Sequence, residues 1–145
     1  MARIKIEITG NEMGTFTIPI RITDINYGNH VGNDAFVGII HEARMQWLQQ
    51  NGYTEMNFAG AGLIMSDLAI EFKKETFYGD ALIVKLYATE ISKVSFDLLY
   101  EMLVMSEQNN VLVAKAKTGM VCFDYEQKKR ISLTEKGKSI LLNRL

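Results

Sequence analysis

Several features that mark membrane, secreted and nucleic-acid-binding proteins are missing from this sequence. Its 145 residues include a single cysteine, Cys122, which cannot support a disulfide framework. The longest apolar runs are far shorter than the roughly 20 residues needed to span a bilayer, and the N-terminus does not resemble a signal peptide. The formal net charge of −1 gives no electrostatic reason to expect a nucleic acid or an anionic membrane as a partner. We therefore expect a soluble, cytoplasmic protein.

What the sequence does contain is the composition of an ordinary globular domain. Apolar residues make up 48% and charged residues 23%, which argues against intrinsic disorder. The length suits one domain with a substantial core, and we find no repeats, low-complexity tracts or linkers. We expect residues 1–145 to form a single domain.

The first 50 residues contain two kinds of periodicity. Residues 2–21 alternate apolar and polar side chains on either side of "TGNEMG", which predicts a two-stranded hairpin. Its apolar residues would be Ile4, Ile6 and Ile8 facing Phe16, Ile18 and Ile20. From residue 34 the period lengthens to that of a helix face, through Phe36, Ile40, Ala43 and Trp47. Asn33 is the expected N-cap, and Gly52 supplies the stop signal.

The remaining segments alternate like strands. They cover residues 64–77, 81–91, 95–105 and 109–123, with turns at 78–80 and 108–110, and a short helix is expected within 132–145. One long helix followed by strands predicts an α+β fold in which the helix packs against one curved antiparallel sheet. Such a sheet has two edge strands, which are commonly covered or paired, so a homodimer is a natural expectation.

A polar loop, "TDINYGNHVGND" at residues 23–34, separates the first strands from the helix. Glycine and asparagine at such a position are typical of turn chemistry. The same residues also suit a substrate site, because glycine lets a ligand approach the backbone and a helix start favours negative charge. The residues alone leave both interpretations open.

The order of the motifs resembles the hotdog-fold acyl-CoA and acyl-ACP thioesterases, which include 4-hydroxybenzoyl-CoA thioesterases. The resemblance covers about residues 16–134 and is carried by four segments. They are the loop frame Arg21, Asp24, Asn26, His30, Val31, Asn33 and Phe36, the helix segment "HEARMQW", the strand "LAIEFKKETFYGD", and "VAKAKTGMVCFD" followed by "KKRISL". This resemblance implies a hotdog fold and hydrolysis of an acyl-CoA or acyl-ACP thioester. Coenzyme A would be part of the substrate, with no other cofactor, and the protein would be a homodimer or homotetramer.

The sequence departs from the family pattern inside the loop. Asn26 occupies the position of the catalytic aspartate in bacterial 4-hydroxybenzoyl-CoA thioesterases, and Gly28 that of an asparagine implicated in plant enzymes. Glu75 replaces the usual proline of the strand motif. Because a carboxamide is neutral and very weakly basic, Asn26 can orient a water or a carbonyl but cannot act as a base.

The resemblance assigns roles to seven residues. His30 is the candidate general base, because imidazole titrates near neutral pH, and Glu42 would orient the imidazole or act as the base itself. The predicted catalytic set is thus His30, Glu42 and Asn26. The predicted substrate-binding set is Asp24, which would hold the loop, and Gly28, Gly32 and Asn33, whose backbone N–H groups would form an oxyanion hole.

Other polar residues receive weaker predictions. We expect His41 to be a surface residue and Cys122 a small core residue, and two histidines without a cysteine cluster predict no metal site. Ser66 and Asp67 would lie near an approaching second subunit. Five basic residues are candidates for the phosphates of coenzyme A: Lys73, Lys74, Lys128, Lys129 and Arg130.

Two other functions remain compatible with the sequence. "DINYGNH" is faintly similar to an enoyl-CoA hydratase signature, so a hotdog hydratase or dehydratase is one alternative. The other is a catalytically silent protein that binds an acyl thioester, which the asparagine at position 26 favours. The acyl chain, the choice between coenzyme A and a carrier protein, and the choice between dimer and tetramer stay open.

Overall fold

The computed structural model describes residues 2–107 and 109–144. The elements follow in the order β1 (Asn11–Pro19), η1 (Ile22–Asp24), α1 (Asn33–Gln50), β2 (Gly62–Phe72), β3 (Ala81–Thr89), β4 (Ser95–Met105), β5 (Asn110–Asp124), β6 (Lys129–Arg130) and α2 (Glu135–Leu141). The expected C-terminal helix is therefore present as α2. The expected turn at 108–110 includes residue 108, which lies outside the described residues.

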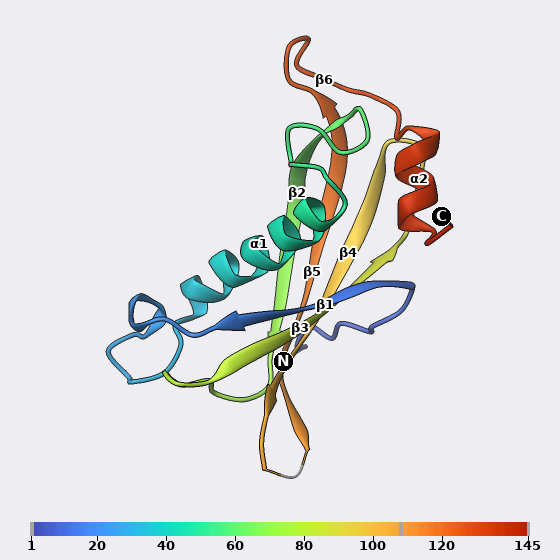
Figure 1. Cartoon of the computed structure of the whole chain (residues 1–145). Helices are drawn as coiled ribbons and strands as arrows, with labels where there is room; N and C mark the ends of the chain where they lie inside the picture. The colour runs from blue at the N-terminus through green and yellow to red at the C-terminus, as the bar shows by residue number, and fades with distance from the viewer. Residues whose placement is uncertain (1, 108, 145) are drawn as a thin grey trace.

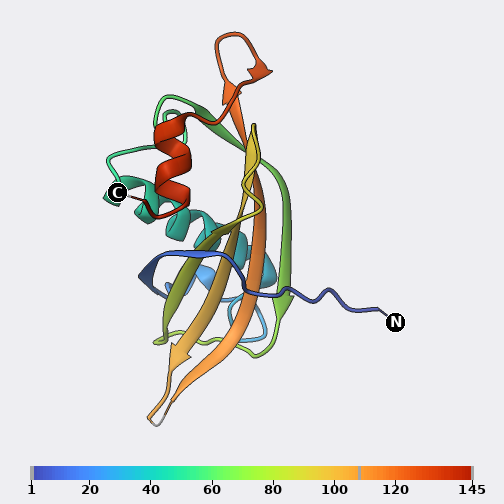
Figure 2. The same cartoon turned by 90° about the vertical axis from the view of Figure 1, so that its right-hand side faces the viewer.

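One curved antiparallel sheet forms the body of the molecule, and α1 crosses its concave face (Figure 1; Figure 2). The strand order is β1-β3-β4-β5-β2, with β6 paired to the end of β5. Thus β2 and β3 are consecutive in sequence but not adjacent, and residues 73–80 cross from one to the other. The α+β architecture predicted from the sequence is confirmed.

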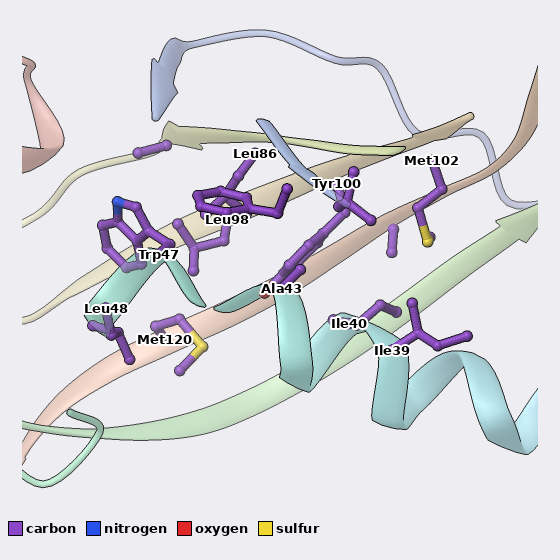
Figure 3. Packing of buried hydrophobic residues seen from close by; sticks show 14 of the residues in the cluster. Ile39, Ile40, Ala43, Trp47, Leu48, Leu86, Leu98, Tyr100, Met102 and Met120 are labelled. Carbon is purple, nitrogen blue, oxygen red and sulfur yellow. The ribbon is translucent and has the colours of Figure 1, made fainter. Parts of the chain in front are cut away.

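The core lies between α1 and the sheet. Residues of the predicted helix face, Phe36, Ile40, Ala43 and Trp47, are all buried. Figure 3 shows Ile40, Ala43 and Trp47 of α1 pointing toward side chains of β3, β4 and β5. Each fully buried large apolar side chain contributes roughly 1.5–3 kcal/mol, so this face fixes α1 on the sheet.

The predicted N-terminal hairpin is wrong. Residues 2–9 form no strand, and β1 pairs instead with β3, in a register that places Phe16 opposite Val84. The segment before β1 is held at Ile6, whose N–H donates to Glu71 (2.9 Å) and whose carbonyl accepts from Lys115 (3.2 Å). Alternation with a period of two is also satisfied by an extended segment that is held by side chains of the sheet, which explains the error.

Two predicted boundaries also need correction. The N-cap of α1 is Gly32 and not Asn33, because Gly32 already has an extended backbone and Asn33 is the first helical residue. The first long strand ends at Phe72 and not at residue 77, because the N–H groups of Lys73 and Lys74 both turn to the carbonyl of Val113. The predicted stop at Gly52 is confirmed by its φ of +78°, a conformation that suits glycine.

No helix in residues 2–107 and 109–144 is long and apolar enough to cross a membrane.

Candidate active site

The loop before α1 is a tight turn closed by backbone hydrogen bonds. Ile25 and Val31 form an isolated antiparallel bridge, and the N–H of Asn26 donates to the carbonyl of His30 (2.9 Å). The side-chain oxygen of Asn26 accepts from the N–H of Gly28 (2.9 Å), as in an Asx turn. Asn29 has a φ of +65°, which asparagine tolerates better than most residues. Turn chemistry therefore explains the conformation of Asn26.

The same turn orients the ring of His30. Its Nδ1 lies 3.1 Å from the carbonyl of Val31, and since a carbonyl only accepts, Nδ1 carries the hydrogen. In the neutral ring, Nε2 then has a free lone pair. A Cβ placed on Gly28 would lie 3.2 Å from this Nε2 and 3.3 Å from the side-chain oxygen of Asn26. Glycine thus keeps the space beside the imidazole open.

A small hollow of about 210 Å³ lies beside His30 at the start of α1. Its lining consists of His30, Val31, Asn33, Phe36, Phe72, Lys73, Lys74, Glu75 and Thr76. The rings of Phe36 and Phe72 meet edge to face, 5.4 Å apart. Thr76 is only 1% exposed, its carbonyl accepts from the N–H of Val31 (2.8 Å), and its hydroxyl has no partner among the described residues. We call this space the His30 hollow.

A larger hollow of about 400 Å³ lies between the outer face of α1, the end of β1 and η1. Its lining consists of Ile18, Pro19, Arg21, Asp24, Gly38, Ile39, His41, Glu42, Met45 and Gln46. Buried Asp24 accepts from the backbone N–H of Arg21 (2.8 Å), and its own carbonyl accepts from the N–H of Gly32 (3.0 Å). Exposed Glu42 accepts from Gln46 one turn along the helix (2.8 Å). We call this space the α1 hollow.

The predicted site residues are thus divided between two places. His30 and Asn33 line the His30 hollow, whereas Asp24 and Glu42 line the α1 hollow. Glu42 lies nine positions after Asn33, a rise of about 13.5 Å along the helix axis. Within one protomer the structure therefore does not bring His30 and Glu42 into the same hollow.

Hydrogen bonds within the loop already use two of the three N–H groups predicted to form the oxyanion hole. The N–H of Gly28 is used by Asn26, and that of Gly32 by the carbonyl of Asp24. The N–H of Asn33, in the first turn of α1, has no partner among the described residues. Since this end of a helix carries partial positive charge, the N–H of Asn33 can still donate to an oxyanion.

A polar network that the sequence analysis missed runs beneath α1. His41 is exposed, as predicted, but its Nε2 lies 2.6 Å from a carboxylate oxygen of Glu55. Buried Arg44 lies 3.7 Å from the same oxygen and donates to the hydroxyl of Tyr100 (3.2 Å), which lies 2.8 Å from that of Thr118. Burial raises the pKa of Tyr100, so this phenol stays neutral. The sequence signal for this network was Arg44, a charged residue directly after Ala43 on the predicted buried face of the helix.

The remaining predicted residues lie outside both hollows or apart from one another. Cys122 is buried, and burial raises its pKa to about 11, which confirms a core role. Ser66 and Asp67 bond to Gly119 of the neighbouring strand. The five basic residues form two groups: Lys73 and Lys74 follow the Phe72 end of β2, whereas residues 128–130 lie beyond its Gly62 end (Figure 1). One chain cannot bring both groups to the same phosphate.

Comparison with known proteins gives consistent results. The family described as the thioesterase-like superfamily matches residues 20–141. A 1,4-dihydroxy-2-naphthoyl-CoA hydrolase from Nostoc punctiforme is 26% identical over 124 residues, which cover 83% of this chain and 81% of that protein.

Solved structures of thioesterases also match. A 1,4-dihydroxy-2-naphthoyl-CoA thioesterase from Synechocystis has a TM-score of 0.76 and 25% identity, and the match covers 88% of this chain and 93% of that one. A mutant of 4-hydroxybenzoyl CoA thioesterase in complex with 4-hydroxybenzoyl CoA has a TM-score of 0.76 at 15% identity, over 88% of this chain and 96% of that one. The second likeness concerns the fold alone.

Proposed function

Because the chain belongs to the thioesterase-like superfamily and has the hotdog fold of its structural neighbours, we propose that it hydrolyses an acyl-CoA thioester. The products are the free acid and the thiol. The observation that carries the proposal is the family match over residues 20–141, which contains every lining residue of the His30 hollow and all of those of the α1 hollow except Ile18 and Pro19. The two relatives named for 1,4-dihydroxy-2-naphthoyl-CoA support coenzyme A as the carrier of the acyl group, with an acyl carrier protein as the alternative.

The His30 hollow supplies the groups that hydrolysis requires. Nε2 of His30 takes a proton from a water molecule as the water oxygen bonds to the thioester carbon. The carbonyl oxygen, now negatively charged, is stabilised by the N–H of Asn33 at the start of α1. When the carbon–sulfur bond breaks, the imidazolium returns its proton to the leaving thiolate. Asn26 does not enter the proton transfer, and its carboxamide holds the turn that positions His30.

Glu42 and Asp24 act from the α1 hollow in this proposal. Asp24 joins the two sites, because it lines the α1 hollow and its carbonyl fixes Gly32 at the helix start. Glu42, held by Gln46, faces the acyl group. Their contribution is to bind and orient the substrate and not to transfer a proton.

The protein is further proposed to work as a homo-oligomer in the cytoplasm. Among residues 2–107 and 109–144, the 11-residue strand β2 pairs with β5 on one side only, and an open strand edge is a ready place for another copy to pair. A single buried cysteine is compatible with a reducing compartment.

Incubation with a panel of acyl-CoAs, followed by detection of free thiol, tests the proposal. We expect release of coenzyme A from aromatic acyl-CoAs such as 4-hydroxybenzoyl-CoA. A change in enoyl absorbance without free thiol would instead identify a hydratase. The carboxamide of Asn26 specifically favours the catalytically silent alternative, because it accepts a hydrogen bond within the turn and cannot act as an acid or a base. That alternative predicts that acyl-CoA raises the melting temperature and that no thiol appears.

A further inference from the structure

Gly38 lies in the sixth position of α1, where the fold itself does not require glycine. Glycine is the least favourable helix residue after proline. Its backbone here is helical, and a Cβ built on it meets no atom within 4 Å apart from its chain neighbours and the adjacent backbone of its own helix. Neither a left-handed turn nor a close neighbour therefore explains why this position has no side chain.

Because Gly38 has no side chain, it leaves space for a ligand in the α1 hollow. Gly38 and Glu42 both line this hollow. At about 400 Å³ the hollow falls within the range of small-molecule pockets. Its lining includes Asp24, whose backbone carbonyl accepts from the N–H of Gly32, the residue before the helix start. Gly38 lies five positions after Asn33, a rise of roughly 7.5 Å along the helix axis. An acyl group whose carbonyl lies at the helix start would thus extend toward Gly38.

The walls indicate what kind of acyl group fits. Apolar surface comes from Ile18, Pro19, Ile39 and Met45. Polar groups on the helix are already held in place: Glu55 lies 2.6 Å from Nε2 of His41, and Gln46 donates to Glu42. Polar groups that are oriented before binding favour a ligand with matching hydrogen-bonding substituents. Gln46 donates to one carboxylate oxygen of Glu42, so the other oxygen can accept from a hydroxyl substituent of the ligand.

We propose that Gly38 is the specificity-determining residue of this enzyme. Its missing side chain admits a broad, ring-containing acyl group whose polar substituents face His41 and Glu42. This proposal rests on the proposed thioesterase function and adds to it the residue that selects the substrate.

The test uses Gly38→Leu and Gly38→Ala, with Val37→Leu as the matched control. Val37 is the exposed neighbour of Gly38 on the same helix and does not line the hollow. Substrates are 1,4-dihydroxy-2-naphthoyl-CoA, benzoyl-CoA and the smallest acyl-CoA that the unmodified protein hydrolyses. We expect Gly38→Leu to lower kcat/KM for the bicyclic substrate at least 100-fold and that for the smallest substrate less than threefold. Gly38→Ala should give an intermediate loss, and Val37→Leu no change.

A binding measurement separates this inference from the proposed function. Titration calorimetry with 1,4-dihydroxy-2-naphthoic acid, the free acid, requires no turnover. We expect Gly38→Leu to weaken its binding at least tenfold and Val37→Leu to leave it unchanged. If no acyl-CoA is hydrolysed but this difference persists, the thioesterase proposal fails and the role of Gly38 stands.

Two results would overturn the role of Gly38. One is an unchanged substrate profile in Gly38→Leu when the unmodified protein is active. The other is an equal loss for the largest and smallest substrates. Since leucine and alanine both favour helix over glycine, we expect both variants to fold. If Gly38→Leu lowers the melting temperature, the smaller Gly38→Ala decides by the same criteria.

Discussion

The two hollows beside α1 are built from different parts of the chain. The His30 hollow depends on the backbone: the turn at 26–30, the carbonyl of Thr76 that holds Val31, and the N-terminal amides of α1. The α1 hollow depends on side chains that project from the outer face of the helix and from the end of β1. A path of hydrogen-bonded backbone is hard to alter by one substitution, whereas a side-chain wall is easily altered.

Chemistry and selectivity can therefore be assigned to separate regions of the molecule. Substitutions in the His30 hollow should affect all acyl thioesters alike, because every substrate shares the thioester group. Substitutions in the α1 hollow should affect substrates according to their acyl groups. The following predictions test this division, in order of decreasing effect.

The largest effect is expected for His30→Ala. Removal of a general base typically lowers kcat by 10²–10⁴-fold, and we expect at least 100-fold for every acyl-CoA that the protein hydrolyses. The measurement is steady-state release of free thiol. His41→Ala is the matched control, because His41 is the other histidine of the chain and lines the α1 hollow. It should retain kcat within threefold. Equal losses in the two variants would contradict the division.

The sequence predicted the elements better than it predicted the site. Periodicity identified α1 and its buried face, because a helix on a sheet must repeat its apolar residues every three or four positions. It failed at residues 2–9, where the alternation of Ile4, Ile6 and Ile8 was interpreted as a paired strand. Pairing depends on which backbone groups are free in the folded sheet, and no local pattern records that.

The site residues were found by resemblance, and their geometry was not predictable. The hydrogen bonds that occupy the N–H groups of Gly28 and Gly32 arise from the closure of the turn. The separation of Asn33 from Glu42 follows from helix geometry once the start of α1 is known. The contact between His41 and Glu55 joins residues 14 positions apart, and depends on the path of the segment after α1.

A second, structural effect is expected for Arg44→Met. This change removes the guanidinium that bonds Tyr100 and faces Glu55, while methionine keeps part of the volume. Loss of a buried hydrogen bond to a charged group costs roughly 1.5–3 kcal/mol. We expect a loss of about 2 kcal/mol in the free energy of unfolding, measured in urea, with the substrate profile unchanged. A changed profile at unchanged stability would place Arg44 in the site instead of beneath it.

A smaller effect is expected for Glu42→Gln. Because Glu42 lines the α1 hollow and not the His30 hollow, we expect KM for substituted aromatic acyl-CoAs to rise about tenfold, or roughly 1.4 kcal/mol. The value of kcat should stay within threefold. Glutamine keeps the shape and can still accept from Gln46. A 100-fold loss of kcat for all substrates would make Glu42 the base and join the two hollows into one site.

The smallest effects are expected from charges outside both hollows. Lys117 bonds Asp67 (2.8 Å) and lies 3.6 Å from Asp97. The hydrogen bond from Lys117 lowers the pKa of Asp67, whereas burial raises the pKa of Asp97. Asp67 therefore adds stability above its unfolded-state pKa of about 3.9, which is lost as the pH falls through its lower folded-state pKa. The contribution of Asp97 to the free energy of unfolding has the opposite sign. Asp97 lowers the stability progressively as the pH rises from about 3.9 to its raised folded-state pKa.

Two single substitutions separate these signs. Asp67→Asn should lower the melting temperature at pH 7, and Asp97→Asn should raise it. Since the side chain of Asp67 is 59% exposed, Asp67 contributes at most about 0.5 kcal/mol to the free energy of unfolding after screening by solvent. The measurement is thermal unfolding between pH 3 and pH 7. The difference in melting temperature between each variant and the unmodified protein should become smaller as the pH falls toward 3. Both variants should keep the full substrate profile, because neither residue lines a hollow. A change in selectivity from either one would extend the site to the outer face of the sheet and break the division into two hollows.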